Sequence, residues 1–406
     1  SVSGKDLVKA PVPNVSNALA GRLPGVTFVQ RGGEPGYDQS TIRIRGLGTM
    51  NDSSPLIIVD GVERSSMEGI DMNEIESINV LKDASLTAVY GIRGANGVII
   101  LTTKVGSESK PSVSFSFNTS IQTPTVMPEF LNSYDYAVLK NEGYLNDNPG
   151  GKPIFSETDL QKFRDGSDPV FYPTKEKYKT LIKNLSAMQQ YNANVIGGTK
   201  TVKYFVSLGY LNQDGQYNTK ELKPLNLGFD PNPHYSRYNL RSNFDIQMTK
   251  DFSASIKLGN QIGKQHFPGT SASNVFFNLL TYAPMTSPGV VDGRLVTGFV
   301  NDPLSVINGR GISSASILAS SGYQDNLDNT FNLNVGLKYK LDFITDGLSV
   351  RAMYAYDHYY KKWETRPKSI DTYSLLRDPD TQKDTFIQTG YEGAFGYSGG
   401  TEANSC

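Results

Sequence analysis

The chain has 406 residues, enough for two or more ordinary domains, and its formal net charge of −1 gives it no general attraction for nucleic acid or for an acidic membrane surface. Hydrophobic residues make up 38% of the chain, and no run of about 18 apolar residues is present that could form a membrane-spanning helix. A single cysteine excludes a disulfide framework, and three scattered histidines give no metal-ligand spacing.

The first hundred residues mix short helices, short strands and clustered glycines. Asn14 and Asp83 can each cap a helix, predicted over 15–19 and 84–90, and the sequence Asn73-Glu-Ile-Glu76 resembles a capping box. Strands are predicted at 26–30, 41–45, 56–60 and 98–103. These elements predict a small α+β domain over residues 13–106, preceded by a residual linker over residues 1–12.

Beyond residue 106, seven segments alternate apolar and polar residues, which places the apolar side chains of each strand on one face. They lie at 112–121, 188–196, 202–212, 237–248, 252–264, 329–341 and 348–360. Ordinary strands average about 5–6 residues, whereas a tilted membrane-spanning strand needs about 9–11. The pattern therefore favours a membrane β-barrel over a soluble sandwich, whose strands also alternate.

Short and long connections alternate between these strands. The short ones are 197–201, 249–251 and 342–347, and the long ones are 122–187, 213–236 and 265–328. Tight periplasmic turns and large external loops are typical of an outer-membrane barrel. Helices are predicted at 133–145 and after the capping sequence Ser156–Asp159, so the loops are expected to build an external surface. Seven is odd, and such barrels close with an even number, so residues 107–406 are expected to form only the N-terminal part of a wall.

Five motifs follow one another in the first domain. They are Ser16–Val26 (SNALAGRLPGV), Ile42–Gly46 (IRIRG), Pro55–Val62 (PLIIVDGV), Glu76–Ser85 (ESINVLKDAS) and Ala88–Thr103 (AVYGIRGANGVIILTT). This series closely resembles the plug domain of the SusC/RagA family of TonB-dependent outer-membrane transporters of Bacteroidetes. The strand–turn–strand sequence of 194–213 is similar to the barrel of the same family. The resemblance implies an antiparallel 22-stranded membrane β-barrel, of which about seven strands are present here, with an α+β plug in its lumen.

The resemblance also implies a function and partners. Members of the family import glycan oligosaccharides or oligopeptides across the outer membrane as multi-pass proteins, with energy from the proton-motive force through the TonB-ExbB-ExbD complex and no cofactor. A SusD-like surface lipoprotein covers the mouth, and two SusC–SusD pairs are expected to form a dimer in outer-membrane lipid; no nucleic acid is implied. No TonB box is recognisable before residue 13. The alternative is a β-rich extracellular glycan-binding or adhesion protein without transport.

Candidate cargo contacts at the plug apex follow from the same resemblance, because two loops of related transporters reach the top of the plug. Carried over to this sequence, the first loop supplies Arg45, Thr49, Met50, Asn51 and Asp52, and the second supplies Tyr90 and Arg93. The alternative is structural. Arg43 and Arg45, two residues apart on one strand face, would pair with lumen carboxylates, and Tyr90 would pack in a glycine-rich turn.

No catalytic set of residues is indicated, so the sequence predicts that the protein is not an enzyme. Asp60-Gly61 is a tight-turn dipeptide, and Gly91, Gly94 and Gly97 match no phosphate-binding pattern. The acidic loop residues near 325–328 lack the spacing of a calcium loop. The aromatic cluster over 356–363 fits a girdle at the lipid interface.

Overall fold

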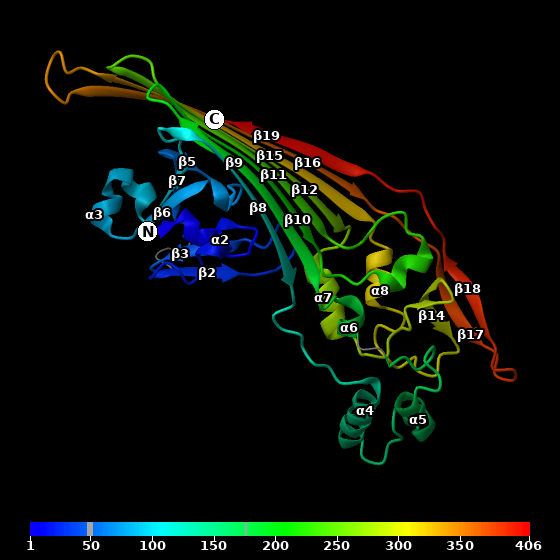
Figure 1. Ribbon diagram of the computed structural model, residues 1–406. Helices are drawn as coiled ribbons and strands as arrows, with labels where there is room; N and C mark the ends of the chain where they lie inside the picture. The colour runs from blue at the N-terminus through cyan, green and yellow to red at the C-terminus, as the bar shows by residue number, and fades with distance from the viewer. Residues whose placement is uncertain (47–51, 175–176) are drawn as a thin grey trace.

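The computed structural model describes residues 1–46, 52–174 and 177–406. A small plug domain lies against the concave side of a curved antiparallel wall, and a layer of helices and short strands lies at one end of that wall (Figure 1). The far end of the wall carries only tight turns (Figure 1).

No helix among the described residues is both long enough and apolar enough to cross a membrane.

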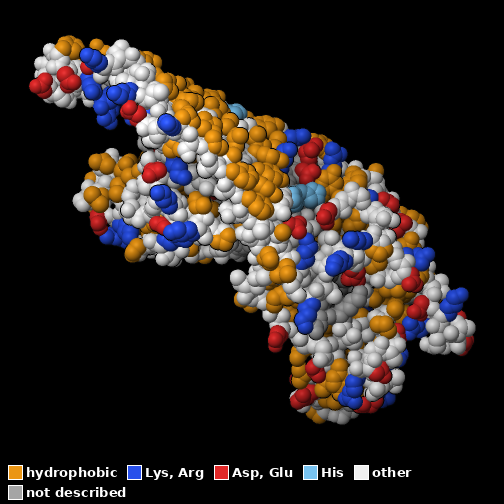
Figure 2. Space-filling model, viewed as in Figure 1, with side chains coloured by type: hydrophobic (Ala, Val, Ile, Leu, Met, Phe, Trp, Pro, Cys, Tyr) orange, Lys and Arg blue, Asp and Glu red, His pale blue; other side chains and the backbone are white. Residues whose placement is uncertain are grey.

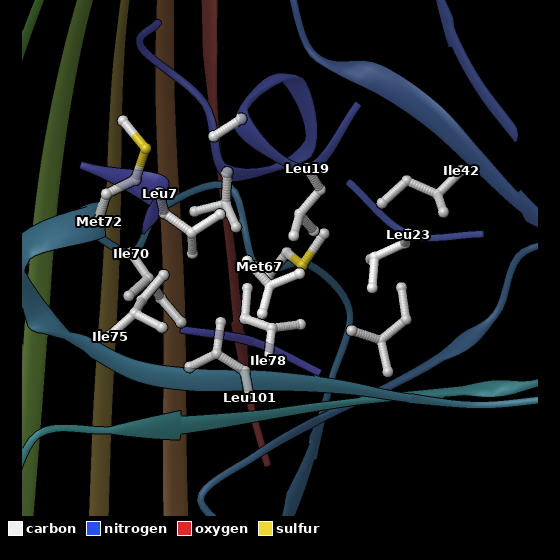
Figure 3. Packing of buried hydrophobic residues seen from close by; sticks show 14 of the residues in the cluster. Leu7, Leu19, Leu23, Ile42, Met67, Ile70, Met72, Ile75, Ile78 and Leu101 are labelled. Atoms are coloured by element: carbon white, nitrogen blue, oxygen red, sulfur yellow. The ribbon is translucent and has the colours of Figure 1, made fainter. Parts of the chain in front are cut away.

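The plug is a five-stranded sheet with short helices around it. In spatial order its strands are β1 (Val2–Ser3), β6 (Ile75–Leu81), β7 (Val98–Thr103), β4 (Leu56–Val59) and β5 (Val62–Arg64). A separate hairpin is formed by β2 (Val26–Gln30) and β3 (Ser40–Ile44), and the helices are α1 (Gly4–Leu7), α2 (Val15–Leu19), η1 (Met72–Glu74), α3 (Ala84–Thr87) and η2 (Ala88–Gly94). The apolar core includes the fully buried Leu7, Leu19, Ile75, Ile78 and Leu101 (Figure 3). Every member of this core comes from the first 101 residues, so the plug has a hydrophobic core of its own.

Two expectations for this domain are corrected. Residues 1–12, expected as a linker, belong to the plug, because β1 pairs with β6 and Leu7 is buried in the core. The sequence Asn73–Glu76 does not begin a long helix: Asp71 caps the single turn η1, and β6 starts at Ile75 as a central strand of the sheet.

The polar residues at two other helix starts bond elsewhere. Asn14 and Asp83 occupy the N-cap positions of α2 and α3, but neither side chain makes a capping bond. Asn14 donates instead to the Asp38 carboxylate over 2.6 Å, and Asp83 pairs with Arg45. The cap positions were therefore predictable, whereas the side-chain partners were not.

The wall contains all seven predicted strands and one more. In spatial order it consists of β19 (Ser398–Ser405), β16 (Ser349–Arg366), β15 (Tyr323–Lys340), β12 (Phe252–Pro268), β11 (His234–Gln247), β10 (Val202–Asp214), β9 (Ser186–Gly198) and β8 (Ser109–Gln122). The eighth strand, β19, pairs with the outer part of β16. Its sequence, SGGTEANS, does not alternate apolar and polar residues, so the strand is recognised only by its backbone pairing with β16. Among the described residues the sheet stays open, with β8 and β19 as its edges.

The long connections fold into an ordered layer. Its helices are α4 (Ser133–Asp147), α5 (Glu157–Asp165), α6 (Lys177–Leu181), η3 (Lys220–Leu225), α7 (Ala272–Thr281) and α8 (Ser314–Ala319), and its sheet is β13 (Val290–Val291), β14 (Arg294–Val300), β17 (Thr372–Arg377) and β18 (Asp384–Gly390). The capping box predicted at Ser156 and Asp159 is confirmed. A buried Arg310 binds Asp302 over 2.8 Å and stacks on Phe299, with 3.8 Å from the guanidinium carbon to the ring centroid. These contacts give the layer a rigid core beyond the strand ends.

The outward face of the wall carries a band of hydrophobic side chains (Figure 2). Cross-strand pairing aligns Phe117, Tyr191, Tyr210 and Tyr238 in one row along the loop-side border of this band. Neighbouring rings in the row lie 4.8–6.0 Å apart between centroids. Such an aromatic row is typical of the border between the hydrocarbon layer and the head groups of a membrane.

Candidate functional site: the plug–wall interface

The inward side chains of β11 form a polar ladder that holds the plug. Arg237, Asn239, Arg241 and Asn243 alternate with outward residues, and each bonds to the plug. The bonds run from Arg237 to the Glu68 carbonyl (3.2 Å), Asn239 to the Gly69 carbonyl (2.6 Å), Arg241 to the Glu74 carboxylate (2.6 Å) and Asn243 to Thr103 Oγ1 (2.9 Å). A single strand thus contacts plug segments from three parts of the domain.

The Arg241–Glu74 pair is the most deeply buried charge pair of the interface. The two side chains are 8% and 1% exposed, and Arg241 Nε lies 2.6 Å from Glu74 Oε2. Burial raises the pKa of the Glu74 carboxyl, while Arg241 opposes that rise by stabilising the anion. Each charge thus depends on the other for compensation, because an unpaired ion in this position would be desolvated without a partner.

A second charged contact joins the plug hairpin β4–β5 to β12. Asp60 and Gly61 both have positive φ, which confirms the predicted tight turn. The Asp60 carboxylate binds Lys257 Nζ at 2.9 Å and the Thr103 amide at 3.0 Å. Burial favours the neutral acid, but Lys257 and Thr103 outweigh it and hold the pKa of Asp60 below its usual range. The sequence identified the turn and missed this role of its carboxylate.

Between the plug and the wall lies a cavity of about 660 Å³. Its lining combines amide and hydroxyl side chains with charged ones. The amides and hydroxyls include Gln39, Ser65, Ser66, Asn260, Gln261, Thr330, Asn332 and Asn334, and the charged residues include Asp60, Arg64, Glu74, Arg241, Lys257 and Asp357. Such a surface can exchange its hydrogen bonds with water or with a polar solute. The cavity extends from β11, where Asn239, Arg241 and Glu74 line it, toward β12, β15 and β16, and it does not reach Asn243.

At the loop end of the cavity, the plug segment around Tyr37 contacts the wall. The Tyr37 ring lies 5.2 Å from that of Phe267, and its hydroxyl accepts a bond of 3.2 Å from Asn326. Gln265 donates to the Gly36 carbonyl over 3.3 Å. The sequence prediction did not include this segment. Its run of glycines and proline over 32–36 is the signal that could have indicated an exposed plug turn.

The predicted apex residues that the structure describes make contacts within the plug. Arg45 has φ of 59° and follows the end of β3, so it does not share a strand face with Arg43; it pairs with Asp83. Arg93 binds Glu63 over 2.6 Å, and Tyr90 lies in η2 beside the kink at Gly91.

Of the remaining apex candidates, Asp52 accepts a bond from the Ser54 amide at 2.9 Å. Thr49, Met50 and Asn51 lie outside the described residues. The arginine pairs are therefore contacts within the plug, and cargo contact by the apex residues stays a prediction. No cluster of potential metal ligands occurs among the residues that the structure describes.

Residues 1–98 match the TonB-dependent receptor plug domain family. TonB-dependent receptor P26 of Formosa agariphila is 33% identical over 64% of this chain and 24% of its own length, and TonB-dependent receptor SusC of Bacteroides thetaiotaomicron is 28% identical over 65% and 25%. The chain thus spans about a quarter of these relatives. The fold is similar to the solved RagAB peptide transporter, with a TM-score of 0.69 at 21% identity, over 90% of this chain and 41% of that one.

A plug domain joined to antiparallel wall strands defines part of a TonB-dependent receptor. Within that class, the sequence likeness to SusC and to TonB-dependent receptor P26, together with the RagAB-like fold, supports a member of the SusC/RagA family.

Proposed function

We propose that the protein acts in TonB-dependent import of glycan oligosaccharides or oligopeptides across the bacterial outer membrane. The observation that carries this proposal is the division between the plug core and the plug–wall interface. The apolar core is built from plug residues alone, whereas the contacts to the wall are mainly ion pairs and hydrogen bonds, beside the ring contact of Tyr37 with Phe267. Water can replace polar contacts without the cost of exposing a hydrophobic core, so the plug can move as a unit.

The energy for this movement would come from the proton-motive force through the TonB-ExbB-ExbD complex, without a cofactor. The N-terminal strand β1 supports this proposal, because it is an edge strand with only the pairs Val2–Ile78 and Ser3–Ser77 to β6. A pull on the N-terminal side would therefore act first on a short edge strand and then on the plug core.

The proposed partners follow from the loop layer and from the relatives. The ordered layer beyond the strand ends can support a SusD-like surface lipoprotein over the mouth, in a dimer of two such pairs in outer-membrane lipid. RagAB is described as a peptide importer, which leaves peptide beside glycan as a cargo class for this chain.

A reversible cross-link tests whether the plug must move. In the full-length protein, the double variant Thr103→Cys with Asn243→Cys places thiols where a plug hydroxyl and a wall amide lie 2.9 Å apart. The control, Ser255→Cys with Gly336→Cys, joins directly paired residues of β12 and β15 and leaves the plug free. Uptake by both double variants is measured in cells supplied with a panel of fluorescent oligosaccharides and oligopeptides.

Oxidation is expected to abolish uptake in the plug–wall variant and to leave it intact in the wall control, and reduction is expected to restore it. Uptake that persists with the plug fully cross-linked would overturn the proposed mechanism. Cargo binding without uptake in either redox state would instead support the adhesion alternative.

A further inference from the structure

The polar surface just beyond the aromatic row has a composition of its own. On the outward face, Lys264 pairs across the sheet with Leu327, and Leu327 pairs with Lys362. On the same face, the next row toward the loop layer contains His234, His266, Asp325 and Glu364. These side chains line a shallow depression of about 410 Å³ on the wall. Charged and histidine side chains border the hydrophobic band toward the loop layer (Figure 2).

In the lining, Lys264 and Lys362 are matched in number by Asp325 and Glu364, and the neighbouring Arg366 adds one positive charge. Glu364 lies 3.5 Å from Lys362 and 3.7 Å from Arg366, so one carboxylate serves two cations. Asp325 binds His266 at 2.5 Å. Lys264 forms no ion pair within the described part of the chain, and its ammonium lies 5.9 Å from the centroid of the Tyr238 ring. Lys264 thus has no carboxylate partner among the described residues, and Lys362 and Arg366 share the single negative charge of Glu364.

The spacing of the two lysines suits one phosphate. They lie two strands apart, which corresponds to about 10 Å at the usual strand separation of about 4.8 Å. Two flexible lysine side chains can span this distance and converge on a shared anion. Leu327 lies between them and continues the hydrophobic band, so the two lysines flank an apolar side chain.

We propose that this depression binds the phosphorylated head group of an outer-leaflet glycolipid. The lipid is favoured over a soluble anion because the site borders the aromatic row and the hydrophobic band, where a head group and its acyl chains lie together. The proposal rests on the membrane location contained in the proposed function. It adds a lipid-binding site on the outside of the wall, separate from the cargo route in the lumen.

Native mass spectrometry of the full-length protein in detergent tests the site, with diphosphorylated lipid A and its dephosphorylated form as probes. A lysine near an anionic head group contributes about 1 kcal/mol, so the double variant Lys264→Gln with Lys362→Gln should weaken binding of the phosphorylated form about 25-fold. The matched control, Lys200→Gln with Lys250→Gln, removes the same charge from exposed turns at the other end of the wall and should bind like the parent protein.

Three results would overturn the proposal: equal affinity for the dephosphorylated lipid, equal weakening by the control variant, or full displacement of the lipid by millimolar inorganic phosphate. The measurement reports lipid binding alone. A negative result with normal cargo uptake would therefore refute the lipid site and leave import standing, whereas a protein that does not insert into membranes would fail both tests.

Discussion

The plug meets the wall in two different ways. Along β11, the contacts of Arg241 and Asn243 are buried and short, and their partners come from the plug sheet and η1. Along β12 to β16, contacts such as that of Lys257 lie around a cavity of about 660 Å³, which Arg241 and Glu74 also line from the β11 side. Water should replace the contact of Arg241 less readily than that of Lys257, because the Arg241 side chain is 8% exposed and the Lys257 side chain is 20% exposed.

The largest effect is expected from Arg241→Ala, which leaves the Glu74 carboxylate buried without its partner. Loss of one member of a buried pair typically costs about 3–5 kcal/mol. Hydrogen exchange of the β6 peptide should report faster opening by a factor of roughly 10²–10³ in the full-length protein. Arg351→Ala, at an exposed wall position, is the control. Unchanged exchange in Arg241→Ala would show that the β11 ladder does not hold the plug.

Lys257→Ala is expected to have a smaller effect on the cavity side. Asp60 keeps its bonds to the Thr103 amide and hydroxyl at 3.0 and 2.7 Å, and water from the cavity can approach. The loss should be about 1.5–3 kcal/mol, measured by hydrogen exchange of the β4–β5 hairpin. A cost equal to that of Arg241→Ala would remove the distinction between the two sides.

Two uncharged amide side chains, Asn243 on β11 and Gln265 on β12, allow the same comparison of the two sides of the interface. Asn243→Ala removes bonds of 2.9 Å to Thr103 and 2.7 Å to the Lys104 carbonyl. Gln265→Ala removes two longer bonds beside the cavity, one of 3.3 Å to the Gly36 carbonyl and one of 3.3 Å from Asn326. We expect a loss of about 1–3 kcal/mol for Asn243→Ala and below about 1 kcal/mol for Gln265→Ala, from urea titrations of plug opening. The reverse order would contradict the assignment of the cavity as hydrated.

The smallest effect concerns pH. Burial raises the pKa of Asp38, so the folded plug holds this proton at pH values where the unfolded chain has already released it. Plug stability should therefore fall as pH rises from the ordinary value near 4 through the raised pKa. Asp38→Asn keeps an acceptor for Asn14 and should flatten this pH dependence. An unchanged pH profile of plug opening would show that Asp38 does not contribute to it.

Period-2 alternation was sufficient to predict the faces of the wall. It located β15 and β16 and their tight turn, because each strand must present apolar side chains to one side. It missed β19, whose small polar residues leave no such pattern. Strand pairing by the backbone alone carries no signal in the side chains.

Partners across the interface could not be predicted in the same way. The polar residues on the inward faces of the strands indicate a hydrated lumen, which fits the cavity but does not identify the plug groups that the β11 ladder binds. Arg241 and Glu74 lie 167 residues apart, and no local rule assigns one carboxylate among many to one guanidinium. Arg45 shows the same limit within the plug, because a positive φ turns it toward Asp83.

The open wall has a consequence for the production of the protein. The edge strands β8 and β19 present backbone donors and acceptors that the described residues do not pair, along a long and strongly hydrophobic sheet. Such edges are templates for pairing with another chain. A recombinant fragment with these boundaries should thus aggregate through its edges, and the separately cored plug is the part of this chain best suited to expression alone.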